Sequence, residues 1–349
     1  MRIGFYSPYL DTFGGGERYM LSLASFLSFD HTVEIFWDDS SIKAPLSRFL
    51  KIDLSQTRLV SNIFKEKLIG KYFSTKKYDC IFVLSDGSVP FTFAKRNILH
   101  FQVPFNFEKL SNRTKLQLSK YNHVVCNSYF TKSFIDKSFH TNSLVIYPPV
   151  DIKAITPKTK ENIILSVGRF SKNQLHPKKQ EILIEVFKEI YKKESDCKLV
   201  LVGQAKKEDQ KYVRYLKKIS KGFAIRILDN LPIEKLRNYY GKSRVYWHAT
   251  GFGEDETKNP EKMEHFGIST VEASAAGCVP VVIAKGGQKE IVIDGKNGLL
   301  WQTKSQLYEK TLEVLKNQEK REYLSQNAVK NSKRFSQEIF QKAYEKILF

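Results

Sequence analysis

Two glutamates, Glu264 and Glu272, lie close together in the second half of the chain, with seven residues between them. The sequence predicts that Glu264 lies on a loop and that Glu272 lies in the first turn of a short helix, from about Ser269 to Ala276. The first N–H groups of such a helix have no partner within it, so they can bind an anion. The pattern therefore predicts a cluster in which anion donors stand beside two carboxylates.

Each carboxylate also has an interpretation without a function. Ser269 and Glu272 have the spacing of a capping box, in which the glutamate only accepts a hydrogen bond from the Ser269 N–H. Glu264 can be an exposed loop charge. Both interpretations stay open on these residues alone.

Two basic residues follow a strand-like run at 162–168. Arg169 comes directly after the run, and Lys178 stands at the start of the next expected helix. Two cations at the mouth of a cleft can neutralise a diphosphate and stabilise it as a leaving group. The alternative is a pair of solvated charges in a basic protein. The polar loop between them spans 171–177.

A Gly-rich turn, Gly14–Gly16, opens an amphipathic helix over 14–28 after the first strand-like run. Glycines permit positive φ and close backbone approach, and the helix start would attract phosphate or a sugar oxygen. The spacing matches neither the dinucleotide fingerprint nor the P-loop. The simpler interpretation is a tight turn in which Glu17 complements the helix dipole. A second Gly-rich turn, at 286–290, follows a strand-like run at 279–284.

Short apolar runs alternate with longer amphipathic stretches along the chain, six runs before residue 151 and five after it. This alternation is typical of β-α units around parallel sheets, whose covered strands are almost continuously apolar. A Pro-containing break at 145–151 separates two such series. The sequence thus predicts an α/β protein with two doubly wound, Rossmann-like domains, whose strands end toward a shared central cleft. We expect domains at 1–154 and 155–333, and a terminal helix at 334–349 that returns toward the first domain.

Composition narrows the class of protein. The 349 residues include 57 Lys and Arg against 37 Asp and Glu, which gives a formal charge of +20. The excess is spread over mixed-sign helical faces such as 206–221, so it favours general attraction to phosphates and anionic lipid surfaces over specific nucleic-acid binding. No stretch has the length and apolarity of a signal peptide or a membrane span. The four cysteines are scattered, which is typical of a reducing, cytoplasmic location and argues against a zinc site.

The ordered set of motifs resembles the retaining glycosyltransferases of the GT-B fold, in the large family 4 group (glycosyl transferases group 1). The resemblance runs from the first residue to the final helix. It is carried by GGGER (14–18), VIYPPVD (145–151), VGRF (167–170) with Lys178, LVG (201–203), EHFGISTVEA (264–273), AAGCVPVV (275–282), GGQKE (286–290) and DGKNGLL (294–300).

The resemblance implies that a nucleotide-diphosphate sugar binds the second domain and an acceptor binds the first. Glu272 would then hold the ribose hydroxyls and Glu264 would contact the transferred sugar. Arg169 and Lys178 would bind the diphosphate, with Lys179 as the alternative to Lys178.

Further positions follow from the same resemblance. The backbone of Gly15 and Gly16 would meet the diphosphate or the sugar, and His100 would lie near the donor sugar. A hydrogen-bonded histidine at the end of a strand is the alternative for His100. The remaining donor-binding positions would be Phe266, Gly267, Ile268 and Glu290.

The implied activity is transfer of a sugar from a UDP- or GDP-linked donor to an acceptor hydroxyl, with retention at the anomeric carbon and without a metal or another cofactor. No Asp-x-Asp stands in a convincing site, since Asp38–Asp39 and Glu254–Glu256 read as solvated loop acids. Either Glu264 acts as nucleophile or the leaving phosphate deprotonates the acceptor. The sequence leaves both routes open.

The implied partners are the donor and a glycan or lipid-linked acceptor, in the assembly of a polysaccharide, glycan or glycolipid. The expected location is the cytoplasm, with peripheral contact at the anionic inner membrane face. Within the same architecture, an epimerase or a phosphorylase is the alternative. From other classes, the alternatives are a basic nucleic-acid-binding protein and a dinucleotide oxidoreductase, which the absent fingerprint disfavours.

Overall fold

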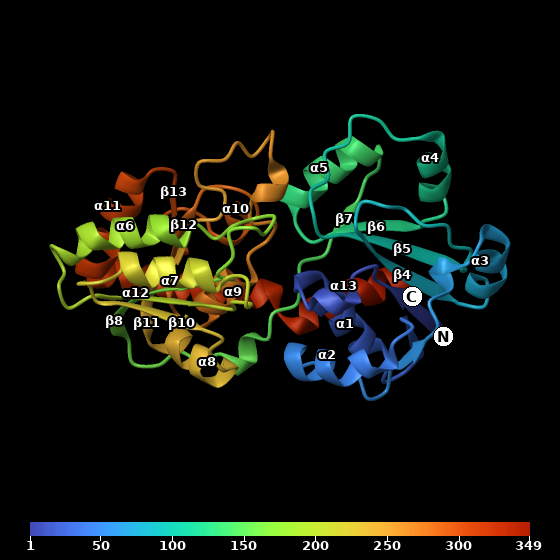
Figure 1. Cartoon of the computed structure of the whole chain (residues 1–349), viewed down its shortest axis with the longest axis horizontal. Helices are drawn as coiled ribbons and strands as arrows, with labels where there is room; N and C mark the ends of the chain where they lie inside the picture. Colours follow the sequence, from blue (N-terminus) through green and yellow to red (C-terminus); the bar gives the residue numbers. More distant parts are fainter. The chain divides into compact units, whose positions relative to one another are not determined.

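The computed structural model describes residues 1–349, which divide into two compact units. Unit 1 comprises Met1–Pro149 together with Gln337–Phe349, and unit 2 comprises Val150–Ser336. Each unit is built around one parallel sheet with helices packed on it (Figure 1). The prediction of two doubly wound α/β sheets is confirmed.

The seven-stranded sheet of unit 1 has the order β3-β2-β1-β4-β5-β6-β7, with every pair parallel. All six residues of β4 are buried, as expected for a central strand that is covered on both faces. In register, Phe5 of β1 lies opposite Phe82 of β4. The strands are β1 (Arg2–Tyr6), β2 (Thr32–Phe36), β3 (Arg58–Val60), β4 (Cys80–Ser85), β5 (Arg96–Phe101), β6 (His123–Cys126) and β7 (Leu144–Val145).

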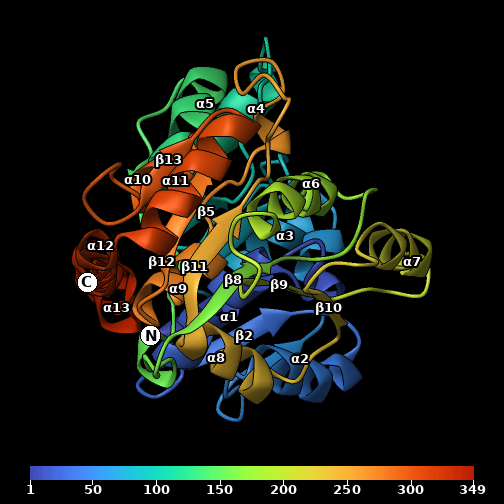
Figure 2. The same ribbon diagram turned by 90° about the vertical axis from the view of Figure 1, so that its left-hand side faces the viewer.

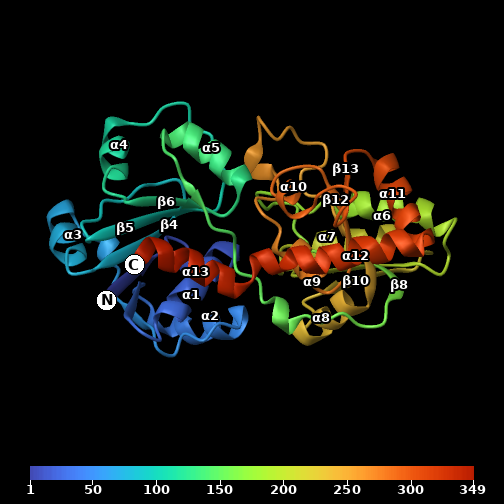
Figure 3. The same cartoon turned by 180° about the vertical axis from the view of Figure 1, so that it is seen from behind.

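The last helix of the chain packs against α1 in unit 1, as the view from behind shows (Figure 3). Tyr344 packs edge-on against Tyr19, and their hydroxyls lie 2.9 Å apart. Phe340 and Leu348 are buried in the same core. The helices of unit 1 are α1 (Gly15–Leu27), α2 (Lys43–Leu50), α3 (Leu68–Thr75), α4 (Asn112–Leu118), α5 (Tyr129–Phe139) and α13 (Gln337–Leu348).

The six-stranded sheet of unit 2 has the order β10-β9-β8-β11-β12-β13 and is also parallel. Helix α6 covers one face of this sheet and α8 the other (Figures 1 and 2). The strands are β8 (Glu161–Val167), β9 (Lys198–Gly203), β10 (Ile225–Asp229), β11 (Ser243–His248), β12 (Val279–Ile283) and β13 (Leu299–Trp301). The helices are α6 (Gln180–Tyr191), α7 (Gln210–Ile219), α8 (Ile233–Lys242), α9 (Ile268–Ala275), α10 (Gln288–Ile291), α11 (Lys304–Lys316) and α12 (Gln318–Ser332).

Two strands, β3 and β13, were not predicted from the sequence. Each is three residues long and lies at the edge of its sheet. Three residues carry too little periodicity to predict a strand, even where all of them are apolar, as in the Leu-Leu-Trp run of β13. None of the helices combines the length and the apolar composition that crossing a bilayer requires.

The strand order reverses between β1 and β4 in unit 1 and between β8 and β11 in unit 2. Open parallel sheets bind ligands beyond the carboxyl ends of the strands at such a reversal. In unit 2 these ends are Val167 and His248. The fold therefore places the residues after β8 and β11 where a ligand site is expected.

Candidate functional site

Glu264, Lys178 and His248 form a buried cluster at the strand-order reversal of unit 2. The Lys178 Nζ lies 2.7 Å from Glu264 Oε2, and His248 Nε2 lies 2.8 Å from the same oxygen. His248 is the last residue of β11, and Lys178 precedes α6 by one residue, Lys179. Only 14% of the Glu264 side chain is exposed, so its interpretation as an exposed loop charge is wrong.

The charges of this cluster are set by burial and by ion pairing. Burial alone would raise the pKa of Glu264, but the Lys178 ammonium and the His248 ring outweigh it, so this pKa lies well below its usual value. Burial lowers the pKa of His248 despite its bond to Glu264. A neutral His248 donates from Nε2 to the carboxylate, which leaves Nδ1 as an acceptor. That Nδ1 is buried without a hydrogen-bond partner.

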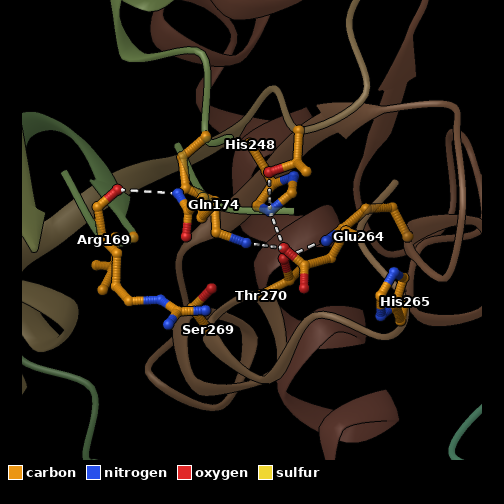
Figure 4. Close-up of polar contacts among 12 residues, drawn as sticks. Arg169, Gln174, His248, Glu264, His265, Ser269 and Thr270 are labelled. Atoms are coloured by element: carbon orange, nitrogen blue, oxygen red, sulfur yellow. Dashed lines mark hydrogen bonds and ion pairs between the residues drawn. The ribbon is translucent and has the colours of Figure 1, made fainter. Parts of the chain in front are cut away.

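The loop 171–177 also brings polar atoms to this region (Figure 4). Gln174 donates its amide to the Ser171 carbonyl at 3.0 Å, while its Oε1 is buried without a partner. The His176 ring lies 4.9 Å from that of His265, and its Nδ1 also has no partner. Burial and the nearby Lys178 hold the pKa of His176 well below its usual value. The loop is therefore folded inward with two hydrogen-bonding atoms unused.

Arg169 follows β8 by two residues, and its side chain points toward Ser269 (Figure 4). Ser269 accepts a hydrogen bond from the Tyr246 hydroxyl at 2.7 Å, which fixes its position. Lys179 points elsewhere, since its Nζ is paired with Glu254 at 3.0 Å. Lys178 is therefore the lysine that contacts Glu264.

Helix α9 begins one residue earlier than predicted, and the capping-box interpretation is wrong. Its N-cap is Gly267, with a φ of 118°, and no side chain caps the helix start. Ser269 thus lies inside the first turn, where it cannot be the cap. Glu272 is the fifth residue of α9, beyond the first turn in which it was predicted, and it accepts a hydrogen bond from the Tyr240 hydroxyl at 2.8 Å.

The second Gly-rich turn supports the Glu264 loop rather than presenting free amides. The Gly286 N–H donates to the Glu256 carboxylate at 3.0 Å, and the Gly287 N–H donates to the Glu264 carbonyl at 2.8 Å. A Cβ on Gly286 would lie 2.3 Å from the Glu264 carbonyl oxygen, so only glycine fits. Glu290 lies three residues after Gly287, in α10.

The loop acids at 254–256 are not all solvated, contrary to expectation. Glu254 pairs with Lys179 at 3.0 Å and with Lys262 at 3.2 Å. Glu256 pairs with Lys289 at 2.6 Å. Lys179 precedes α6, Lys262 lies in the loop after β11, and Lys289 lies in α10. The two glutamates therefore connect the loop after β11 to α6 and α10. Nowhere in the chain are three His, Cys, Asp or Glu residues grouped so that they could hold a metal ion.

In unit 1, the Gly-rich turn uses close packing rather than positive φ. The N-cap Gly14 has a φ of −92°. The Glu17 carboxylate accepts hydrogen bonds from the Gly14 N–H at 2.8 Å and from the Thr12 hydroxyl at 2.9 Å. A Cβ on Gly16 would lie 3.1 Å from the Leu84 side chain. The first turn of α1 can therefore lie close to the end of β4.

His100 is fully buried near the end of β5, and its ring stacks on Tyr19 of α1 at 3.9 Å. Burial lowers the pKa of His100 to about 3, so the ring is neutral at physiological pH. Its Nε2 lies 2.6 Å from the Gln102 amide nitrogen, while its Nδ1 is buried without a partner. His100 is thus only half satisfied by its strand-end contacts.

The structure groups the predicted residues by unit. Arg169, Lys178 and Glu264 lie around the carboxyl ends of β8 and β11, and 266–268 with Glu272 belong to the adjoining turn and helix. In unit 1, Gly15 and Gly16 begin the helix whose Tyr19 stacks on His100. His248, Gln174 and His176 were not predicted from the sequence. A polar residue that ends an apolar strand was the available signal for His248.

Two parallel-sheet α/β units, with a buried ionic cluster at the strand-order reversal of one, define a protein of the Rossmann-like class. The chain belongs to the family described as Glycosyl transferases group 1, whose sequence model matches residues 149–331. That match covers more than half of the chain and nearly all of unit 2.

Relatives agree with this assignment. The chain is 31% identical over 219 residues to the uncharacterized glycosyltransferase MJ1178 of Methanocaldococcus jannaschii, covering 62% of this chain and 56% of that protein. It is 25% identical over 238 residues to the human GDP-Man:Man(3)GlcNAc(2)-PP-Dol alpha-1,2-mannosyltransferase, covering 62% and 46%. The chain spans about half the length of these relatives. The fold resembles Anabaena Alr3699/HepE in complex with UDP-glucose, with a TM-score of 0.72, 18% identity, and coverage of 100% and 99%.

Proposed function

We propose that the chain is a retaining glycosyltransferase of family 4. It transfers a sugar from a UDP- or GDP-linked donor to an acceptor hydroxyl, in the assembly of a polysaccharide, glycan or glycolipid. The observation that carries the proposal is the buried Lys178–Glu264–His248 cluster at the strand-order reversal of unit 2, inside the segment that matches the family. The human relative uses GDP-Man and the Anabaena protein holds UDP-glucose, which supports both donor classes.

In this proposal the donor lies along the carboxyl ends of β8 and β11. Arg169 and Lys178 bind the diphosphate, and the uncapped start of α9, with the turn 266–268, adds N–H groups. Glu272, oriented by Tyr240, holds the ribose hydroxyls. Glu290 would complete the donor side.

In this proposal, residues of unit 1 bind the acceptor and contact the donor. The backbone of Gly15 and Gly16 meets the diphosphate or the sugar, and the acceptor binds this unit. His100 takes its implied place near the donor sugar with a ring that stays neutral.

The chemical step needs charge stabilisation as the diphosphate leaves. Arg169, Lys178 and the peptide N–H groups are placed to stabilise the developing negative charge. Both contacts of the Glu264 carboxylate use Oε2, which leaves Oε1 to face the sugar. A carboxylate that stays anionic can stabilise positive charge at the anomeric carbon or attack it. The alternative, deprotonation of the acceptor by the leaving phosphate, uses the same cations.

Nucleotide binding provides the direct test. We expect calorimetry to detect UDP or GDP, and transfer assays to show a product whose anomeric configuration, read by NMR, is that of the donor. The Glu272→Ala variant should raise the donor KM about 10- to 100-fold with little change in kcat, because a hydrogen bond to a charged group contributes about 1.5–3 kcal/mol. Glu189→Ala, on the exposed face of α6, is the control.

The same assay separates the other candidate functions. Donor turnover without any acceptor would indicate an epimerase, and phosphate-dependent release of the sugar a phosphorylase. If UDP, GDP and ADP all fail to bind and no sugar is transferred, the proposal is overturned. Salt-sensitive binding of nucleic acid without turnover would indicate the nucleic-acid-binding class instead.

We further propose that the enzyme needs no metal ion and no other cofactor. Arg169, Lys178 and the start of α9 supply the stabilisation that Mg²⁺ gives in other transferases. Product formation should therefore stay unchanged when EDTA is added in excess. Collapse of the activity in EDTA and its recovery with Mn²⁺ would contradict this prediction.

The proposed location is the cytoplasm, with a glycan or lipid-linked acceptor and peripheral contact at the anionic inner membrane face. The human relative's named substrate, Man(3)GlcNAc(2)-PP-Dol, supports a lipid-linked acceptor. The spread of the positive charge along the chain supports contact with anionic surfaces rather than a nucleic-acid partner.

A further inference from the structure

Helix α3 of unit 1 presents its apolar side chains to solvent. Leu68, Ile69, Tyr72 and Phe73 are 53%, 75%, 38% and 63% exposed. They stand at positions i, i+1, i+4 and i+5, so they share one face of the helix. Thr75 is the only buried residue of α3. The usual pattern, with the apolar face toward the core, is therefore reversed.

Other helices of the chain show the contrast. In α6 the apolar face is buried, with Leu183, Ile184 and Phe187 in the core of unit 2. A cluster of exposed large apolar side chains on one helix is unusual for a surface that meets only water, and it marks an interaction site.

Local hydrogen bonds hold α3 in this orientation. The Thr75 hydroxyl donates to the Lys71 carbonyl at 2.6 Å and accepts from the Phe93 N–H at 2.9 Å. The ring of Phe93 lies 5.2 Å from that of Tyr72. These contacts tie the buried side of α3 to the segment before β5, so the apolar face cannot turn inward without losing them. Figure 1 shows α3 at the periphery of unit 1.

Lysines surround the apolar face. The segment 65–77 contains Lys65, Lys67, Lys71, Lys76 and Lys77 but only one acid, Glu66. Of these lysines, Lys65 is paired with Asp38 at 2.6 Å. Glu66 accepts a hydrogen bond from the Ser74 hydroxyl at 2.9 Å. Burial and the nearby Arg113 of α4 lower the pKa of Lys71, so α4 adds a further positive charge close to this segment.

We infer that α3 docks this chain on an anionic lipid surface. Leu68, Ile69 and Phe73 would enter the boundary between headgroups and acyl chains. The flexible lysine stems would let the ammonium groups reach lipid phosphates at the same time. With eight residues, α3 is far too short to span a bilayer and lies in the interface instead.

The charge decides between lipid and a second copy of the chain. In a symmetric dimer through α3, the lysines of one segment would face those of the other, which is unfavourable. An anionic bilayer offers an apolar layer beneath a negatively charged surface and so satisfies both kinds of side chain. The inference names the surface for the peripheral membrane contact proposed above, and it does not rest on the proposed transferase activity.

Vesicle sedimentation of the full chain tests this inference. We expect binding to vesicles of equal parts phosphatidylglycerol and phosphatidylcholine, no binding to phosphatidylcholine alone, and release at high salt. The double variant Ile69→Ser/Phe73→Ser should lower the vesicle partition coefficient by about tenfold or more. Lys67→Glu/Lys77→Glu should weaken binding in the same direction. Phe29→Ser, a 70% exposed apolar residue that follows α1, is the matched control and should bind like wild type.

Three results would overturn the inference. They are no binding to anionic vesicles, equal binding by wild type and Ile69→Ser/Phe73→Ser, and a dimer in sedimentation velocity that this variant abolishes while neither form binds vesicles. Thermal unfolding followed by circular dichroism shows that each variant is folded, whether or not the chain binds nucleotide. Vesicle binding and nucleotide binding are then measured separately, so failure of the inference and failure of the proposed function give different results.

Discussion

Replacing Glu264 by glutamine (E264Q) is expected to lower kcat by about 10²- to 10⁴-fold, the range typical of acid–base and electrostatic catalytic groups. The substitution keeps the size of the side chain and removes its negative charge. In the native protein that charge is held by Lys178 and His248, and the pKa of Glu264 lies well below its usual value, so the carboxylate is anionic at every physiological pH. A neutral amide stabilises a positively charged anomeric carbon much less than a carboxylate does, and it is a much weaker nucleophile.

Nucleotide affinity should change much less than kcat in E264Q, because the proposed contacts to diphosphate and ribose involve Arg169 and Glu272. Steady-state kinetics with saturating donor, together with calorimetry of the free nucleotide, separates the two effects. E261Q alters a glutamate in the same loop and is the control. Similar, small losses of kcat in E264Q and E261Q would return Glu264 to a structural role.

The sequence was sufficient for the architecture, because central parallel strands must be apolar on both faces. The buried run of β4, Cys80–Ser85, shows that pattern without interruption. The starts of α1 and α9 were predicted to within one residue, whereas α6 begins two residues after Lys178 and α13 begins at Gln337 rather than at 334. The short edge strands β3 and β13 were not readable, because three residues carry too little periodicity.

The candidate site was only partly predictable. Residue types and spacing pointed to Arg169, Lys178 and Glu264, but not to what surrounds them. That Glu264 is buried depends on loops distant in sequence, and its contact with His248 joins residues from two ends of a long loop. Spacing also suggested a Ser269–Glu272 capping box, but the positive φ of Gly267 starts the helix earlier.

Removing the Lys178 ammonium should reveal the effect of burial on the pKa of Glu264. In Lys178→Met (K178M), only the His248 and His176 rings remain against the burial that raises the pKa of Glu264, so this pKa should rise. We expect kcat/KM to fall by about 10²-fold or more, because the diphosphate also loses a cation. In addition, the acidic limb of the pH profile of kcat/KM should move to higher pH, since Glu264 would become protonated earlier. K179M, which breaks the separate pair with Glu254, is the matched control and should leave the acidic limb in place.

Stability should follow the same titration. In wild type the folded-state pKa of Glu264 is depressed, so its ionisation stabilises the fold above the unfolded value of about 4.3, and this contribution is lost as pH falls through the lower folded value. In K178M the stabilisation that comes from ionised Glu264 disappears. If the folded-state pKa of Glu264 then exceeds its unfolded value, ionisation of this carboxyl destabilises the fold, and stability falls as pH rises. The Tm difference between wild type and K178M should therefore be largest near pH 7, where breaking a buried pair typically costs about 3–5 kcal/mol, and should shrink toward pH 3. A difference that stays constant across this range would show that Lys178 does not hold the charge of Glu264.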